Sequence, residues 1–230
     1  MKKALIVLVL VIFSNYWLYS QFTKGDVLVD LTGSYIESVS GSGGGITTSA
    51  TKSKTLDINL SVGTCISNSF SLGFSIEYGH ASNLEKNDIY VFERYILKDQ
   101  VETKANIIAP GFFLRYDKNV LGKLCFIAEF NTSYGFVNST YDVISAGSSR
   151  LVDLDTPLSY VYAYDGSDES EIFNISLSPE LVYFLGEKVG LMIKIGGIQY
   201  TSFDFKEHEW KVSVNPSTWE YGIFFRFKKK

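Results

Sequence analysis

Eight segments of the sequence alternate between apolar and polar residues with a period of two. The clearest runs over residues 70–78, where every even position is Phe, Leu, Ile or Tyr and every odd position is Ser, Gly or Glu. Period two is the side-chain period of a β-strand. The other segments cover residues 27–35, 56–66, 108–116, 124–136, 173–183, 189–196 and 218–227. The pattern predicts an all-β chain of eight strands.

The two faces of these segments differ in charge. The apolar face carries no charged residue in any of the eight segments. The opposite face consists mainly of Ser, Gly, Asn and Thr, and it carries nine charges: Asp30, Asp57, Glu77, Arg115, Glu129, Glu180, Lys194, Glu220 and Arg226. An arginine or lysine that faces lipid at mid-depth costs about 2–4 kcal/mol, so this distribution is typical of strands whose apolar face meets a bilayer.

Volume decides which face points inward. A soluble, lipocalin-like barrel would place the apolar face inside, but eight strands enclose only enough room for their own side chains or one small ligand. About forty mostly large apolar residues lie on the apolar faces, and they exceed that space. We therefore expect the apolar face to point outward into lipid, and a closed barrel satisfies every backbone group there.

The connections between the segments alternate in length. Short ones cover residues 67–69, 117–123 and 186–188, and long ones cover residues 37–54, 79–104, 137–171 and 200–217. The tract at 38–51 is rich in Gly, Ser and Thr and is typical of a flexible loop. The sequence thus predicts an eight-stranded antiparallel up-and-down transmembrane β-barrel, with short periplasmic turns and long extracellular loops.

The N-terminus has the features of a secretory signal. Lys2 and Lys3 precede a ten-residue apolar run at residues 4–13, which is too short for a membrane span. We predict a cleaved signal peptide at 1–20 and a barrel domain at 21–230. The formal charge of −4 and the lack of a basic patch exclude a nucleic-acid binder.

Short motifs add a resemblance to a known family. Pro110 begins a stretch that ends in Arg115 and Tyr116, a Ser-Pro-Glu-Leu stretch covers residues 178–181, and the last segment is aromatic up to Phe227. With these features the chain resembles the outer-membrane β-barrel domain family, the small OmpA/OmpX-like barrels of Gram-negative bacteria. The resemblance implies the cell outer membrane as location and assembly by the barrel-insertion machinery, although three lysines follow the final aromatic residue.

Inward charges in a narrow barrel are expected to pair, because an unpaired buried charge is costly. We predict an interior network that blocks the lumen, formed by Glu77, Arg115, Glu129, Glu180, Lys194 and Arg226. Glu180 and Lys194 should lie level across their hairpin. Cys65 and Cys125 fall on strands that are not neighbours, so we expect free thiols rather than a disulfide.

No constellation for catalysis emerges from the sequence. His80 and His208 both fall in predicted loops, without a nucleophile and base in a recognised arrangement. A metal at residues 207–209 and a Ca²⁺ ion among the acids of residues 165–171 are weaker alternatives to solvated loop residues. We predict no enzyme activity, no cofactor and no metal.

The leading functional hypothesis is a non-enzymatic outer-membrane protein that anchors surface loops for adhesion or envelope interaction. The alternatives are a narrow porin-like channel or conduit for small or hydrophobic molecules and, with less support, a lipid-modifying enzyme. The expected partners are outer-membrane lipid, lipopolysaccharide, periplasmic chaperones and the insertion machinery. A monomer is expected.

Overall fold

The computed structural model describes residues 22–44, 47–91, 95–149 and 158–229, so the predicted signal peptide lies outside the described residues. The described part is an antiparallel β-sheet of ten strands with one short 3-10 helix and no α-helix. No helix in it is long and apolar enough to cross a membrane. The prediction of an all-β, antiparallel, up-and-down fold is confirmed.

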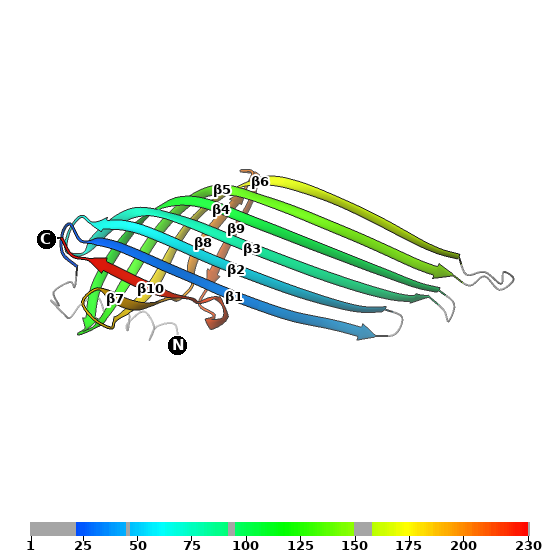
Figure 1. The fold of residues 1–230 in the computed structure, drawn as a ribbon, viewed down its shortest axis with the longest axis horizontal. Helices are drawn as coiled ribbons and strands as arrows, with labels where there is room; N and C mark the ends of the chain where they lie inside the picture. Colours follow the sequence, from blue (N-terminus) through cyan, green and yellow to red (C-terminus); the bar gives the residue numbers. More distant parts are fainter. Residues whose placement is uncertain (1–21, 45–46, 92–94, 150–157, 230) are drawn as a thin grey trace.

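The strands follow one another along the chain, and the first six are much longer than the rest (Figure 1). The elements are β1 (Val27–Gly44), β2 (Thr47–Cys65), β3 (Phe70–Val91), β4 (Tyr95–Leu121), β5 (Leu124–Ser149), β6 (Leu158–Phe184), β7 (Val189–Lys194), β8 (Gly197–Phe203), β9 (Glu207–Ser213), the 3-10 helix η2 (Pro216–Thr218) and β10 (Glu220–Phe227).

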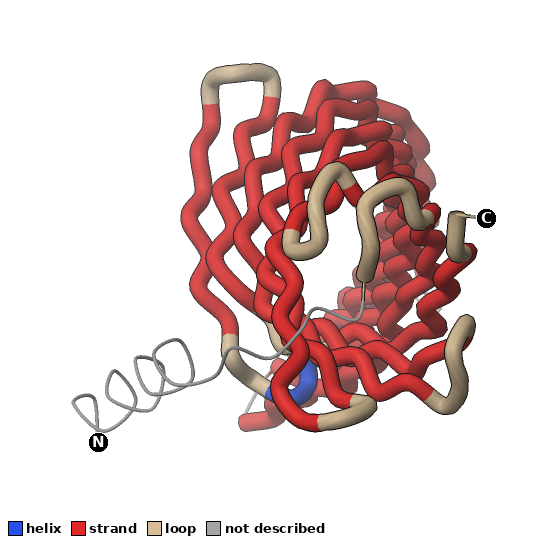
Figure 2. The backbone as a smooth tube through the Cα atoms, turned by 90° about the vertical axis from the view of Figure 1, so that its left-hand side faces the viewer, coloured by secondary structure: helices blue, strands red, loops and turns tan. Residues whose placement is uncertain are grey.

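Sequential pairing runs from β1 to β6, and β6 then pairs with β7, β7 with β10, and β10 with β1. These pairings therefore follow one another around a ring of eight strands, which Figure 2 shows from one end. The short turns and the end of β10 lie at one end of the ring, and the long strands project from the other (Figure 1).

The strand count is ten because the last two ring positions are interrupted. β7 and β8 both pair with β6, and they are separated by Ile195 and Gly196. Gly196 has φ of 60°, a conformation that a residue with a side chain rarely adopts. β9 pairs with β8 alone among the described strands, and η2 separates it from β10. The sequence does not predict β9 because residues 207–213 are mostly polar.

The prediction of long loops at residues 37–54, 79–104 and 137–171 is wrong. β1 and β2 stay in register as far as Gly44 and Thr47, and β3 with β4 and β5 with β6 continue likewise. The backbone hydrogen bonds of the ladder hold these segments as strands, although their composition lacks the apolar alternation of the lipid-facing part. The fourth predicted loop, residues 200–217, contains the end of β8, all of β9 and most of η2.

The predicted orientation of the two faces is confirmed. On β3, the side chains of Leu72, Phe74 and Ile76 are exposed, and those of Ser71 and Ser75 are buried. Phe74 is 64% exposed and packs against Phe112 of β4, with the ring centroids 4.8 Å apart. The interior instead contains small or polar residues. Gly63 and Gly73 leave the space that the inward-facing ring of Phe113 occupies, since a Cβ on either would collide with it.

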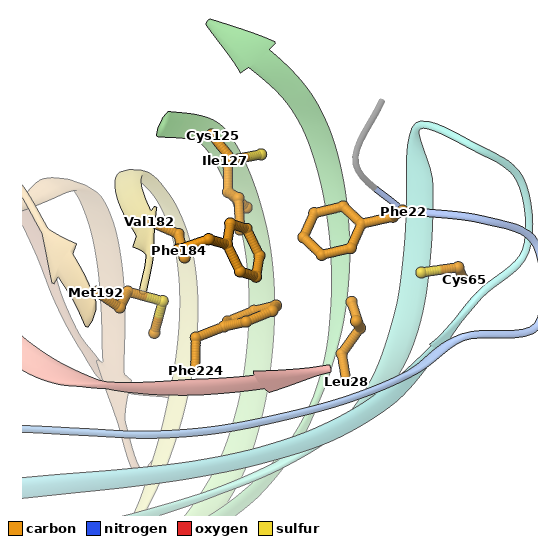
Figure 3. Close-up of a cluster of buried hydrophobic side chains, with 9 residues drawn as sticks. All are labelled: Phe22, Leu28, Cys65, Cys125, Ile127, Val182, Phe184, Met192 and Phe224. Atoms are coloured by element: carbon orange, nitrogen blue, oxygen red, sulfur yellow. The ribbon is translucent and has the colours of Figure 1, made fainter. Parts of the chain in front are cut away.

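An apolar cluster fills the interior at the end with the short turns (Figure 3). Phe22, which precedes β1, is fully buried there and packs against Phe184 and Phe224 with ring centroids 5.9 and 5.7 Å apart. The apolar cluster consists of Phe22, Leu28, Cys65, Cys125, Ile127, Val182, Phe184, Met192 and Phe224. It closes the ring interior at this end with side chains that exclude water.

Both thiols belong to the apolar cluster and are free, as the sequence predicts. Because Cys65 and Cys125 are buried, we expect neither to react with a water-soluble thiol reagent while the refolded protein is intact. Both should react after unfolding in urea. The measurement is thiol titration by absorbance before and after urea. Rapid labelling of one thiol in the folded protein would contradict the burial described above.

Candidate functional site

A layer of charged side chains lies next to the apolar cluster, toward the projecting end of the ring. On β1, Leu28 of the cluster is followed on the same face by Asp30, and on β5 Ile127 is followed by Glu129. Alternation thus places these carboxylates one step further along the interior. The ion-pair layer comprises Asp30, Arg115, Glu129, Glu180 and Lys194, from β1, β4, β5, β6 and β7.

Arg115 is the centre of the ion-pair layer and is 1% exposed. Its Nη1 donates to Asp30 Oδ2 at 2.5 Å, and its Nε donates to Glu129 Oε2 at 2.6 Å. Arg115 and Glu129 are register partners on β4 and β5, whereas Asp30 reaches Arg115 from β1, across the interior. The guanidinium also lies 4.2 Å from the centroid of the Phe113 ring. A planar fork of donors suits such simultaneous contacts.

Lys194 connects the remaining carboxylate to this centre. Its Nζ donates to Glu129 Oε1 at 3.0 Å and lies 3.6 Å from Glu180 Oε1. Glu180 and Lys194 are register partners on β6 and β7, which places them level across the hairpin. The nearest cation on the other side of Glu180 is Arg115, with Nε 4.0 Å from Oε2. The layer therefore holds three carboxylates against two cations.

Of the six residues predicted for the interior network, the structure brings Arg115, Glu129, Glu180 and Lys194 together. Asp30 was recognised in the sequence as an inward charge, but its pairing with Arg115 was not. Its partner lies on a strand that is not adjacent, so no spacing in the sequence indicates the contact.

Glu77 and Arg226 lie elsewhere, so their predicted membership of the network is corrected. Glu77 stands opposite Ala109 on β4, further toward the projecting end than Arg115, which stands opposite Ser71. Arg226 lies at the short-turn end, where its Nε and Nη2 donate to the Glu187 carbonyl at 3.0 and 2.6 Å. Its guanidinium is also 5.4 Å from the centroid of the Phe184 ring. Both residues are on the inward side of their strands, as predicted, but they lie at other heights along the barrel because of the stagger and length of the strands.

Beyond the ion-pair layer, the interior contains a cavity of about 460 Å³. Its wall includes Ser34 and Asp57 of β1 and β2, Ser133 of β5, and Glu220 of β10, while Lys194 of the ion-pair layer lies at its floor. The ring interior is thus layered: the apolar cluster, the ion-pair layer and then a polar cavity toward the projecting end.

The two histidines lie outside these layers. His80 Nδ1 is 2.8 Å from Asn106 Oδ1, and His208 Nδ1 is 2.9 Å from the Tyr200 hydroxyl and 3.1 Å from the Ser202 hydroxyl. Among the described residues, no three His, Cys, Asp or Glu side chains lie close enough together to hold a metal ion.

Comparison with known proteins gives structural likenesses only, since no family model and no curated protein matches the chain. The N-terminal β-barrel domain of Pseudomonas aeruginosa OprF is 11% identical, covers 90% of this chain and 100% of its own, and has a TM-score of 0.35. Ail, the attachment invasion locus protein of Yersinia pestis, is 10% identical, with 89% and 100% covered and a TM-score of 0.38. Both likenesses concern the fold alone.

The outward face determines where such a chain is stable. Large apolar side chains, among them Phe74, Phe112, Phe136, Leu191 and Ile223, are exposed around the ring. A surface of this kind is stable in contact with lipid, and strands cross a membrane as the wall of a barrel. The chain has the fold and the apolar outer surface of a membrane-spanning β-barrel. The charged side chains of its interior are separated from that lipid by the strands themselves.

Proposed function

We propose that the protein is a closed barrel of eight strand positions that anchors a rigid binding surface outside the cell, without enzyme activity. The short turns then face the periplasm and the long strands face outward. The observation that carries the proposal is the continuation of six strands well beyond the ring (Figure 1). Ordered strands present side chains in fixed positions, which lowers the entropic cost of binding a partner.

The projecting sheet is defined by one row of register partners: Ser38, Ser53, Asn83, Thr103, Tyr141 and Gly166. It comprises this row and everything beyond it, residues 38–44, 47–53, 83–91, 95–103, 141–149 and 158–166. On the face continuous with the ring interior, β1 and β2 present Ser and Thr, β3 presents Asn and Glu, and β5 and β6 present Tyr and Val. Tyr, Ser, Gly and Asn are the residue types that dominate antibody paratopes.

Tyrosines are the principal anchors on this face. Tyr162 and Tyr164 are 59% and 50% exposed, and they share a face with Tyr141 of the neighbouring strand. The Tyr141 and Tyr164 hydroxyls are 3.3 Å apart, and this hydrogen bond raises the pKa of Tyr141 above its usual value. Exposed tyrosines offer apolar area and a hydrogen-bonding group with few rotatable bonds, which suits recognition of a protein or glycan.

The absence of enzyme activity is part of the proposal and is supported by the histidine environments. His80 contacts an amide, and His208 contacts two hydroxyls; among the described residues, no carboxylate forms a hydrogen bond that would orient either imidazole as a base. Outer-membrane lipid and lipopolysaccharide are the proposed surroundings of the apolar belt. Periplasmic chaperones and the insertion machinery are proposed partners during assembly, and the mature barrel is proposed to be a monomer.

The test is a truncation that removes the projecting sheet and keeps the ring. Residues 39–52, 84–102 and 142–165 are each replaced by Asn-Gly, which closes a two-residue hairpin between register partners. Attachment of expressing cells to one another and to an epithelial cell layer is compared with that of the parent and the empty strain. We expect the truncated barrel to remain heat-modifiable on gels and to lose the attachment that the parent confers.

Two outcomes would count against the binding surface. One is a parent that confers no attachment, and the other is a truncated barrel that attaches cells as well as the parent does. A double variant, Tyr162→Ser with Tyr164→Ser, separates the tyrosine anchors from the sheet as a whole. We expect it to weaken attachment without affecting assembly, because both side chains are exposed.

A narrow channel is the second candidate, and the polar cavity beside the ion-pair layer is the observation that favours it. A conducting path has to pass Arg115 and its three carboxylates and then the apolar cluster. We therefore expect no sustained ion current when the refolded protein is placed in a planar bilayer. Steady single-channel conductance in the parent would favour the channel over the anchor.

A further inference from the structure

The polar cavity has the size of a ligand site. Its volume of about 460 Å³ lies within the range of about 300–1,000 Å³ that is usual for small-molecule pockets. Its floor is formed at Lys194, and its wall is built from the inward faces of strands on all sides of the ring. A solute can reach it from the projecting end without crossing the ion-pair layer.

The charges on the cavity wall do not balance. Four carboxylates line it, on Asp57, Glu77, Glu209 and Glu220, whereas the lysines that line it are Lys194 and Lys211. Lys194 already forms an ion pair with Glu129 of the ion-pair layer, with Nζ 3.0 Å from Oε1. The cavity is therefore electronegative and favours a cationic solute.

The carboxylates on the cavity wall differ in their hydrogen bonds. Asp57 accepts from the Ser34 hydroxyl at 3.2 Å, and Glu220 accepts from the Thr32 hydroxyl at 3.0 Å. Glu77 forms no hydrogen bond or ion pair with any other residue that the structure describes. Its carboxylate is thus a free anionic group of the cavity, as is that of Glu209 among the described residues.

A second group on the wall also lacks a partner. Asn174 of β6 is 6% exposed and lines the cavity, and its Oδ1 forms no hydrogen bond within the described part of the chain. A buried amide oxygen without a donor is unfavourable, and such groups usually have a partner when the site is filled. The missing partner is a hydrogen-bond donor, and the Asn174 amide has to rotate to meet one in the cavity because its oxygen is inaccessible as it stands.

The chemistry of the wall indicates an organic cation rather than a metal ion. The cavity carboxylates belong to no group of side chains, among those described, that is close enough to hold a metal. Aliphatic side chains, Ile36, Ile107 and Ile172, line the same cavity. Several anionic groups and aliphatic side chains on one cavity wall match a chain of methylene groups that carries ammonium groups at intervals.

We propose that this cavity binds a linear aliphatic polyamine. One ammonium group pairs with Glu77, the methylene groups pack on the isoleucines, and a further ammonium group reaches the remaining carboxylates of the wall. After a rotation of its amide, Asn174 accepts a hydrogen bond from the bound amine. This site is independent of the binding surface on the projecting sheet, and either can exist without the other.

Calorimetric titration of spermidine into the full refolded protein, in a zwitterionic detergent at low salt, tests the proposal. We expect saturable binding, and binding about tenfold or more weaker in Glu77→Gln, because one charge-assisted hydrogen bond is lost. Glu77→Gln should fold, since the carboxylate supports no other described side chain. Glu102→Gln is the matched control: it removes the same charge from the projecting part of β4, where Glu102 pairs with Lys104 at 2.9 Å.

The chemical class is tested with two competitors. 1-Aminobutane, with a single ammonium group, should displace spermidine poorly, and Mg²⁺ at the same concentration should do no better. The proposal is overturned if the parent shows no saturable binding, if Glu77→Gln binds spermidine as tightly as the parent, or if Mg²⁺ displaces it with equal potency. The last result would show attraction by charge alone.

Discussion

Replacing Arg115 with methionine is expected to lower the free energy of unfolding by about 3–5 kcal/mol. The substitution retains much of the side-chain volume and removes the cation that faces Asp30, Glu129 and Glu180. All three carboxylates are buried, and only Lys194 would remain to neutralise them. The cost arises because charges without partners remain in an interior that water does not reach.

Two further variants serve as controls for the Arg115→Met prediction. Lys104→Met breaks a pair with Glu102 that is substantially exposed, and such pairs contribute about 0–1 kcal/mol. Glu180→Gln removes the excess carboxylate and leaves two carboxylates against two cations in the ion-pair layer. Since the Glu180 oxygens have no hydrogen-bond partner among the described residues, we expect this variant to be at least as stable as the parent.

Urea unfolding of the refolded protein, followed by tryptophan fluorescence and by mobility on unheated gels, measures all three variants. The expected order of stability places Arg115→Met far below the parent and the other two near it. If Arg115→Met unfolds at the same urea concentration as the parent, the ion-pair layer is hydrated and contributes little. The channel would then become the better account of the interior.

Replacing Phe74 with arginine is expected to destabilise the barrel in lipid by about 2–4 kcal/mol, the cost of an arginine at the bilayer midplane. Phe74 is the central residue of the apolar stretch of β3 and points outward. The substitution also removes its contact with Phe112. We expect a lower folded yield in lipid vesicles and unfolding at a lower urea concentration.

Leu84→Arg is the matched control on the same strand. It lies ten residues further along β3 on the same face, about 33 Å at the usual rise of a strand, and therefore outside the hydrocarbon layer. An arginine introduced at this position should have little effect. Equal destabilisation at both positions would contradict the assignment of the membrane level, and tolerance of arginine at Phe74 would contradict the lipid-facing surface itself.

The side of the strand to which each side chain points was predictable from the sequence, because it is a local property. Successive side chains of a strand point to opposite sides, so the alternation at residues 70–78 already indicates that Ser71 and Ser75 share a face opposite to Phe74. The lipid requirement keeps charge off one face, which reveals its orientation. The same reasoning predicted free thiols, since Cys65 and Cys125 lie on strands that are not neighbours.

The ion-pair partners of the inward charges were harder to predict from the sequence. Glu180 with Lys194 could be anticipated because they are six residues on either side of the same short turn. Asp30 with Arg115 could not, because β1 and β4 are not adjacent and their relative height depends on the stagger of the strands between them. Glu77 was misplaced for the same reason.

The sequence by itself determined the fold class, the two faces and the charged interior, because each follows from a short-range pattern imposed by lipid. Only the tertiary structure decided that three of the predicted loops are strands. Outside the lipid both faces of a strand tolerate polar residues, so the Gly-, Ser- and Thr-rich tract of β1 and β2 has no apolar alternation to reveal it. Those residues are strands because the register set inside the membrane continues, hydrogen bond by hydrogen bond, as far as Gly44 and Thr47.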